Sequence, residues 1–199
     1  MSRSLRIVVA DDEQDMRDYF RKILPLLGHH VVSAAENGRE LVLACKEHKP
    51  DLVITDIKMP EMDGIDAAVE IYQEQAIPVI LVSAYHTDGL IHRAEADHIM
   101  AYLVKPIKQA DLEPAIAIAC RRFEQFQALR KEAADLRQAL EDRKIIERAK
   151  GVLMRKTGLD EADAFRRLQK LASDRNRKLV EVAHMILTAE EAFQPPSKL

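Results

Sequence analysis

The sequence predicts an α/β fold, a doubly wound five-stranded parallel sheet followed by a helical coiled-coil linker and a small three-helix bundle. Two observations carry this prediction. Over residues 1–122, short apolar runs alternate with longer amphipathic segments, whereas the later patterns are almost entirely helical. The length of 199 residues and the 47% hydrophobic composition allow one full domain and a smaller second unit.

Five apolar runs are the expected strands of the sheet. The runs Leu52 to Thr55 and Val79 to Val82 are apolar without alternation, which is typical of central strands covered on both faces. Pro25 lies inside the first helical pattern and should bend or end it. The expected strands are 5–11, 30–35, 51–55, 77–82 and 99–104, and the expected helices are 13–27, 37–48, 64–75, 88–97 and a segment from 108 onward.

Polar residues stand at the carboxyl ends of these strands, where open parallel sheets bind ligands. Asp11 and Asp12 end the first strand, Asp56 the third and Ser83 the fourth, and Lys105 follows the fifth. Clustered carboxylates repel one another unless a cation lies among them, and Mg²⁺ prefers oxygen ligands. A single aspartate in such a place is usually a helix cap. The whole set instead predicts a magnesium site where an aspartate acts as a nucleophile toward phosphorus.

Four motifs together resemble the receiver domain of two-component response regulators over residues 5–122. They are Asp11-Asp12, the segment from Asp56 to Gly64, Ser83-Ala84 and Lys105-Pro106. The resemblance implies a flavodoxin-like fold and phosphorylation of Asp56 by a sensor histidine kinase. It also implies that the chain is not an enzyme beyond slow dephosphorylation of its own aspartyl phosphate.

The same resemblance implies roles for the residues around Asp56. Mg²⁺ would be held by Asp12, Asp56 and the carbonyl of Lys58, with Asp11 assisting through water. Ser83 and Lys105 would contact the phosphoryl group. Tyr102 is similar to the family's aromatic switch residue, and the bond between Lys105 and Pro106 is cis in the family.

The segment 123–143 carries a short heptad seam, which predicts a coiled coil and a homodimer. In the mechanism that we expect, phosphorylation favours this dimer, and the sequence leaves open whether the unphosphorylated protein is already dimeric. The alternative is a surface helix that packs on its own chain. Arg143 falls where the seam would continue, so the coil is expected to stop or change there. The seam residues, spaced alternately three and four apart, are Phe126, Leu129, Ala133, Leu136 and Leu140.

Residues 144–192 are expected to form three helices, with Gly158 ending the first, Asp160 capping the second and a disordered tail at 193–199. Residues 143–178 hold 12 basic and 5 acidic side chains, a net charge of +7, whereas residues 1–122 hold 14 and 20, a net charge of −6. A basic unit of this size favours nucleic-acid binding over a merely solvated surface.

Four segments of this unit resemble the ANTAR domain of AmiR- and NasR-type antiterminators over residues 136–190. The resemblance implies binding to tandem RNA hairpins in nascent transcripts and transcription antitermination. The proposed RNA contacts are Lys150, Arg167, Arg175 and Lys178, whereas Ala149, Ala164, Phe165 and Ala172 are expected in the core. The segments are Ile146 to Met154, Glu161 to Leu168, Ala172 to Leu179, and Val182-Ala183.

Two other functions stay open for the basic bundle. It could place a helix in the major groove of DNA, or it could be a phosphorelay or protein-interaction module with a solvated surface. The sequence has no run of apolar residues long enough for a membrane span, so we expect a cytoplasmic protein without a membrane partner. Cys45 and Cys120 lack metal-ligand spacing and are expected to be buried, reduced thiols.

Overall fold

The computed structural model describes residues 4–84 and 99–193. The expected helix at 88–97 lies outside the described residues. The chain divides into two compact units, Met1–Gln127 and Ala128–Leu199, and helix α5 contributes to both. Among the described residues, no helix has the length and apolar character that a membrane crossing would require.

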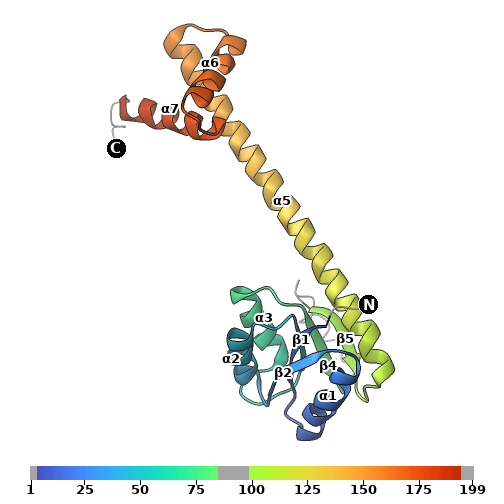
Figure 1. The fold of residues 1–199 in the computed structure, drawn as a ribbon. Helices are drawn as coiled ribbons and strands as arrows, with labels where there is room; N and C mark the ends of the chain where they lie inside the picture. The colour runs from blue at the N-terminus through green and yellow to red at the C-terminus, as the bar shows by residue number, and fades with distance from the viewer. Residues whose placement is uncertain (1–3, 85–98, 194–199) are drawn as a thin grey trace. The chain divides into compact units, whose positions relative to one another are not determined.

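The first unit contains the predicted sheet of five parallel strands, and the structure gives their order as β2-β1-β3-β4-β5 (Figure 1). The strand order reverses between β1 and β3. The strands are β1 (Arg6–Ala10), β2 (His30–Ala35), β3 (Leu52–Asp56), β4 (Val79–Ser83) and β5 (Ile99–Val104). The helices around the sheet are α1 (Gln14–Leu26), α2 (Gly38–His48), α3 (Gly64–Glu74) and the first part of α5 (Gln109–Thr157).

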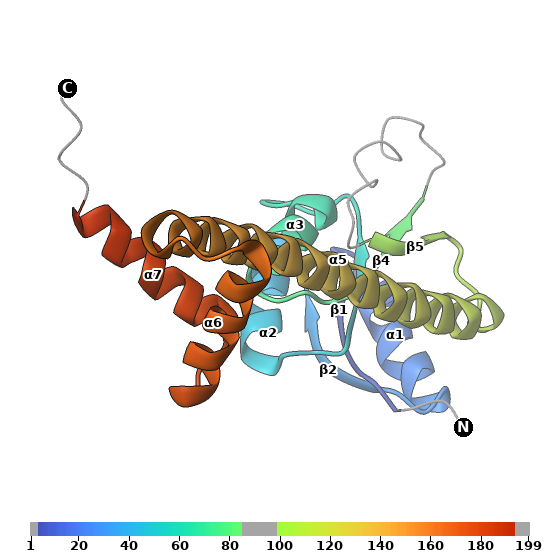
Figure 2. The same cartoon turned by 90° about the horizontal axis from the view of Figure 1, so that it is seen from above.

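Alternate residues of each strand enter two separate cores because successive side chains point to opposite faces. Val8 and Val53 pack with α2 and α3 on one face. Ile7 and Ile54 pack with α1 and α5 on the other (Figure 2). Because both faces are covered, β3 and β4 are buried along their whole length, which explains their continuous apolar sequence.

The helix boundaries follow the local sequence signals. Asn37, Asp63 and Asp160 each accept a hydrogen bond from the backbone N–H three residues later, at the starts of α2, α3 and α6. Helix α1 contains Pro25 and ends one residue later. Helix α5 ends before Gly158, whose φ of 70° is the left-handed conformation that favours glycine.

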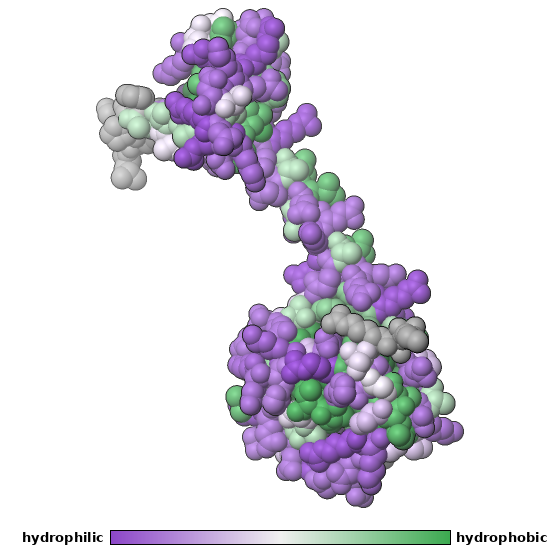
Figure 3. Space-filling view, in the orientation of Figure 1, coloured by the Kyte–Doolittle hydropathy of each residue, from purple (hydrophilic) through white to green (hydrophobic). Residues whose placement is uncertain are grey.

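Helix α5 runs without interruption through Arg143, so the helix does not end where the apolar seam ends. The first helical pattern of the predicted bundle therefore belongs to the same helix as the predicted linker. Figure 3 shows apolar side chains along the middle of α5, where Leu129, Leu136 and Leu140 are exposed.

The second unit is built from the last part of α5, α6 (Glu161–Asp174) and α7 (Leu179–Phe193). Ala149, Leu168 and Ala183, one from each helix, are fully buried at its centre. Ala164 and Ala172 are buried as expected. The expectation for Phe165 was wrong, because 36% of this residue is exposed.

Gly64 is fixed by its close approach to the end of β3. A Cβ atom at this position would lie 2.0 Å from the carbonyl oxygen of Asp56. We therefore expect Gly64→Ala to lower the free energy of unfolding of the first unit by about 3 kcal/mol, since backbone must shift. Urea unfolding followed by circular dichroism measures the loss, and hydrogen exchange in β3 localises it.

Gly151→Ala is the matched control, because a Cβ atom there meets only Nη1 of Arg155 at 3.6 Å. This change should stabilise α5 by about 0.5–1 kcal/mol, the usual difference between alanine and glycine in a helix. Equal effects of the two substitutions would contradict the role given to Gly64.

Candidate functional site

The carboxylates of Asp11, Asp12 and Asp56 converge at one edge of the first unit. One oxygen from each lies within 4.8 Å of the others. They come from the ends of β1 and β3, the neighbouring strands at which the strand order reverses. Asp11 is fully buried, Asp56 is 8% exposed, and Asp12 faces solvent. The predicted acidic cluster is therefore present.

Asp56 is held by backbone on both sides of β3. The N–H of Ile57 donates to the carbonyl of Val82 at 3.0 Å, and the N–H of Gly64 donates to the carbonyl of Ile57 at 2.8 Å. The hydroxyl of Thr55 donates to the carbonyl oxygen of Asp56 at 2.9 Å. These bonds fix the start of the loop that returns to α3, so the position of the carboxylate is set by rigid neighbours.

Lys105 is the cation of the cluster. Its Nζ lies 2.9 Å from Oδ2 of Asp11, 3.0 Å from Oε1 of Glu13 and 3.6 Å from Oδ2 of Asp56. Partial burial disfavours the charged ammonium, but hydrogen bonds to Asp11 and Glu13 outweigh this effect and raise the pKa of Lys105. The bond between Lys105 and Pro106 is cis, in agreement with the family pattern.

Burial dominates the ionisation of the two inner carboxyls. It raises the pKa of Asp11, against the lowering effect of the hydrogen bond with Lys105. It also raises the pKa of Asp56 to about 6, with Lys105 acting in the opposite direction and Asp11 adding repulsion. Because burial and mutual repulsion disfavour the negative charge of these carboxylates, the site favours binding of an added cation.

The cluster fits a hard divalent cation by its donor set. All three side chains offer carboxylate oxygen, the ligand type that Mg²⁺ prefers. Oδ2 of Asp11 is buried, and the ammonium of Lys105, at 2.9 Å, is the cation beside it. An oxygen in this condition can take part in a metal site directly or through water.

Arg17 is a site residue that sequence reasoning missed. It is 4% exposed, and its Nη1 donates to the carbonyls of Asp11 at 2.8 Å and Asp12 at 3.0 Å. Its Nη2 pairs with Glu36 at 2.7 Å. The guanidinium therefore ties down the backbone that carries the two acids. Its sequence signal was a charged residue on the buried face of α1, beside Phe20 and Leu24.

The other predicted site residues, Ser83, Tyr102 and Lys58, differ in burial. Ser83 is buried at the end of β4, and its carbonyl accepts from the N–H of Lys105 at 2.8 Å. Tyr102 lies on β5, half-buried, and packs against the core formed with α2 and α3. Lys58 is exposed in the loop that follows Asp56.

The second unit carries a basic surface, but Lys150 is not part of it. Lys150 is only 7% exposed, and its Nζ lies 2.7 Å from Glu147 and 2.8 Å from Glu161. Its ammonium thus links α5 to the first turn of α6. The proposal that Lys150 contacts RNA is therefore corrected. A lysine with two carboxylate partners and little exposed surface stabilises the packing of the bundle instead.

The other three proposed contacts, Arg167, Arg175 and Lys178, are exposed. Within residues 4–84 and 99–193, none of them forms an ion pair, whereas Arg177 pairs with Glu181 at 3.7 Å. Arg166 likewise pairs with Asp163. The three unpaired cations are therefore more available to an anionic partner than their neighbours are.

The two cysteines differ from each other. Cys45 is 3% exposed, and burial raises the pKa of its thiol to about 12. Cys120 is a thiol that takes part in no disulfide within the described residues, and it is only half-buried, so the expectation that it is buried was wrong. Its side chain lies on the part of α5 that packs on the sheet, at the margin of that core.

Burial of Asp56 makes the stability of the first unit depend on pH. Burial raises the pKa of Asp56 to about 6, so the folded state holds the proton of this carboxyl more tightly than the unfolded chain does. The resulting contribution to the free energy of unfolding is present below about pH 4 and is lost as pH rises through about 6. Asp56→Asn should therefore gain about 2 kcal/mol over the natural chain between pH 4 and pH 8, in buffer with a metal chelator. Urea unfolding across this range measures the difference.

Asp135→Asn on the exposed part of α5 controls for the loss of one negative charge. The control should show a small and nearly constant difference over the same range of pH. A gain for Asp56→Asn that is equally large at pH 4 and pH 8 would contradict the burial of a titrating carboxyl.

Comparisons with known proteins find a family match for each of the two units. A family model described as the response regulator receiver domain matches residues 7–117, and the ANTAR domain model matches residues 134–187. The transcriptional regulatory protein PdtaR of Mycobacterium tuberculosis strain H37Rv is 43% identical over 182 residues, which cover 92% of this chain and 89% of that protein. The chemotaxis protein CheY of Bacillus subtilis is 44% identical over 107 residues, 53% of this chain and 88% of that protein.

Solved structures match the first unit. The receiver domain of NarL from Mycobacterium tuberculosis aligns with a TM-score of 0.56 and 26% identity, covering 60% of this chain and 98% of that one. A chain from the CheX–CheY–BeF3–Mg²⁺ complex of Borrelia burgdorferi aligns with a TM-score of 0.53 and 26% identity, covering 56% and 85%. Receiver and ANTAR domains together are typical of regulators rather than of enzymes. The chain belongs to the response regulators of two-component systems that carry a C-terminal ANTAR domain.

Proposed function

We propose that this chain is an RNA-binding antiterminator whose activity is set by phosphorylation of Asp56 by a sensor histidine kinase. The observation that carries the proposal is the convergence of Asp11, Asp12, Asp56 and Lys105 at one sheet edge. Receiver domains are phosphorylated by histidine kinases, and ANTAR domains bind RNA. The relative PdtaR, described as a transcriptional regulatory protein, supports a role in transcription.

The phosphoryl transfer uses the ionised carboxylate of Asp56 as its nucleophile. An oxygen of Asp56 forms a bond to phosphorus while the bond from phosphorus to the kinase imidazole breaks, and the imidazole nitrogen keeps the electron pair and takes up a proton. Lys105, 3.6 Å from Asp56, offsets the negative charge of the transferred group. The hydroxyl of Ser83, at the end of β4, would contact the transferred group.

The acidic residues have a second task in this scheme. Asp12, Asp56 and the carbonyl of Lys58 would hold Mg²⁺, with Asp11 assisting through water. The ion supplies neutralisation of the carboxylates and of the phosphoryl oxygens. Arg17 keeps the backbone of Asp11 and Asp12 in place for this purpose. The matched chain from the complex with BeF3 and Mg²⁺ supports a site of this type.

The response to phosphorylation is a shift between two states of the first unit. In the phosphorylated state, Ser83 moves toward the phosphoryl group and Tyr102 turns inward from β5. The altered surface favours a homodimer in which the exposed Leu129, Leu136 and Leu140 of two chains form the coiled coil. Pairing two ANTAR units would let two hairpins be bound together with higher effective concentration.

The basic surface formed by Arg167, Arg175 and Lys178 would contact the RNA backbone. These side chains are exposed and, within the part of the chain that the structure describes, unpaired. Contacts of this kind recognise the shape of a folded RNA through its phosphates rather than by reading a base sequence. Phe165, exposed on the same helix as Arg167, adds an aromatic face that sequence reasoning had assigned to the core.

Phosphorylation is tested with Asp56→Asn. Treatment of the natural chain with acetyl phosphate and Mg²⁺ should add one phosphoryl group, seen as a shift in a phosphate-affinity gel, and should tighten binding to a two-hairpin RNA in fluorescence anisotropy. Asp56→Asn should show neither change, because the amide is not a nucleophile. Asp135→Asn should behave as the natural chain. Retained phosphorylation of Asp56→Asn would show that another residue accepts the group.

The RNA surface is tested with the triple variant Arg167→Gln, Arg175→Gln, Lys178→Gln. If each side chain contacts one phosphate, the slope of log affinity against log salt concentration should become shallower by about 2, and binding should weaken by tenfold or more. The control triple Lys22→Gln, Arg39→Gln, Lys131→Gln removes the same charge from exposed positions elsewhere. Equal losses in both triples, or a preference for duplex DNA over the hairpins, would reject the proposed surface.

A further inference from the structure

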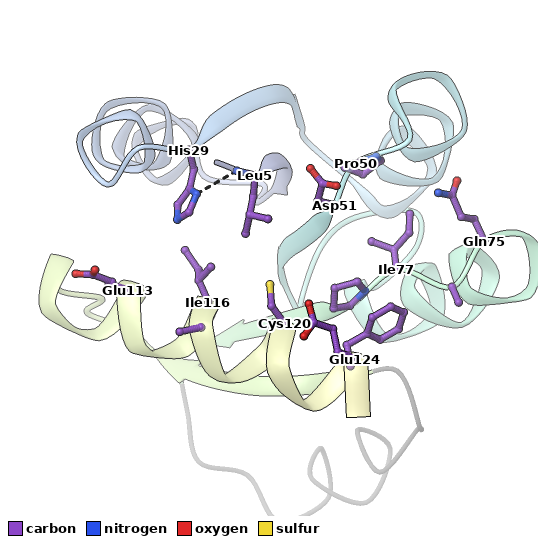
Figure 4. Close-up of a pocket in the computed structure, with 14 residues that line it drawn as sticks. Leu5, His29, Pro50, Asp51, Gln75, Ile77, Glu113, Ile116, Cys120 and Glu124 are labelled. Carbon is purple, nitrogen blue, oxygen red and sulfur yellow. Dashed lines mark hydrogen bonds between the residues drawn. The ribbon is translucent and has the colours of Figure 1, made fainter. Parts of the chain in front are cut away.

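A cavity of about 420 Å³ lies at the other edge of the sheet, at the amino-terminal ends of the strands. One wall is α5, and the opposite wall is made by the residues that precede β1, β2, β3 and β4 (Figure 4). A five-residue strand spans roughly 16 Å, so the cavity is well separated from Asp56. All of its lining residues belong to the first unit.

The interior of the cavity is mainly apolar. Ile116 and Phe123 come from α5, and Leu5 and Ile77 come from the opposite wall. The volume falls within the range of small-molecule sites, which are usually apolar with a few placed polar groups. The cavity therefore has the size and the lining of a ligand site, and its polar groups decide the class of ligand.

The charged groups around the cavity are all acidic. Asp51, Glu113 and Glu124 contribute to its lining, and no lysine or arginine occurs among the described residues that line it. Figure 4 shows Glu124 on the α5 wall and Asp51 on the opposite wall. A cavity with this charge repels anions and favours a ligand with a positive charge.

His29 contributes a neutral imidazole to the wall of the cavity. His29 is 5% exposed, and its Nδ1 accepts a hydrogen bond from the N–H of Leu5 at 3.3 Å, drawn in Figure 4. Burial lowers the pKa of His29, so the neutral ring carries its proton on Nε2. In the part of the chain that the structure describes, Nε2 donates to no partner.

We propose that this cavity binds a small hydrophobic amine. Its apolar body lies between α5 and the sheet edge, and its ammonium lies beside the carboxylates of Asp51, Glu113 and Glu124. The ligand would hold α5 against the sheet by lying between Ile116 and Leu5, which face each other across the cavity (Figure 4). This site requires neither Asp56 nor the RNA surface, so its test is independent of the proposed function.

Cys120 lines the cavity and reports on its occupation. The full chain is treated with methyl methanethiosulfonate, and intact mass spectrometry follows formation of the Cys120 adduct. Phenethylamine, cyclohexylmethylamine and hexylamine are the probes, with 2-phenylethanol as the uncharged match of the first. Saturating amine should slow modification of Cys120 about tenfold, and the alcohol should need about fivefold more for half-protection, the factor expected from a solvent-exposed charge pair.

Two variants assign the protection to the cavity. Glu113→Gln with Glu124→Gln changes exposed side chains and should remove the difference between amine and alcohol. Glu47→Gln with Glu132→Gln, an exposed pair outside the cavity, should keep it. Ala117→Trp, which fills the cavity from an exposed position of α5, should abolish protection by every probe.

Cys45 is the internal control, because burial and its raised pKa should keep it unmodified in every sample. The rate with glutathione in place of the protein checks that the amines do not consume the reagent. Absence of protection by all three amines would overturn the proposal. Equal protection by amine and alcohol would also overturn it, as would protection that grows with protein concentration alone, since a second copy would then cover the cavity.

Discussion

The structure of the acidic site depends on the repulsion between its buried carboxylates and on the relief of that repulsion by Lys105. Parallel strands whose order reverses between β1 and β3 bring Asp11 and Asp56 together, and burial disfavours the negative charge of both. The ammonium of Lys105 enters this group from the end of β5 and contacts Asp11 and Glu13 most closely. The edge is therefore held by attraction between strands that are not neighbours, and it remains short of positive charge.

The sequence was sufficient for the fold and for the acidic cluster because both depend on order along the chain. Apolar runs followed by Asp11, Asp56 and Lys105 place these groups at one edge of any parallel sheet. Arg17 was missed and Lys150 was assigned to the RNA surface because the roles of both depend on tertiary partners. Arg17 is defined by backbone carbonyls at the acidic turn, and Lys150 by Glu161 on another helix. Residue spacing marked Arg17 as a charge on the buried face of α1 but did not identify its partners, and it gave no sign of the partner of Lys150.

The second unit shows how a high net charge can overstate the surface that is available to a partner. Arg155, Arg166 and Arg177 each have a carboxylate partner on the same unit, and Lys150 has two. Exposed pairs of this kind stabilise little, but they reduce the attraction of their cations for phosphate. The sequence also did not show that α5 is continuous. The apolar seam ends at Arg143, but the helix goes on, because a change in the apolar pattern does not by itself end a helix.

The contact between Gly64 and the carbonyl of Asp56 makes the support of Asp56 different on its two sides. Toward α3, Asp56 meets backbone directly, and the loop between them is closed by the bond from Gly64 to Ile57. Toward Lys105, it meets a long side chain that can rotate. Asp56 is therefore held rigidly on the α3 side and more loosely on the β5 side. A covalent change at its carboxylate would displace the group toward β5.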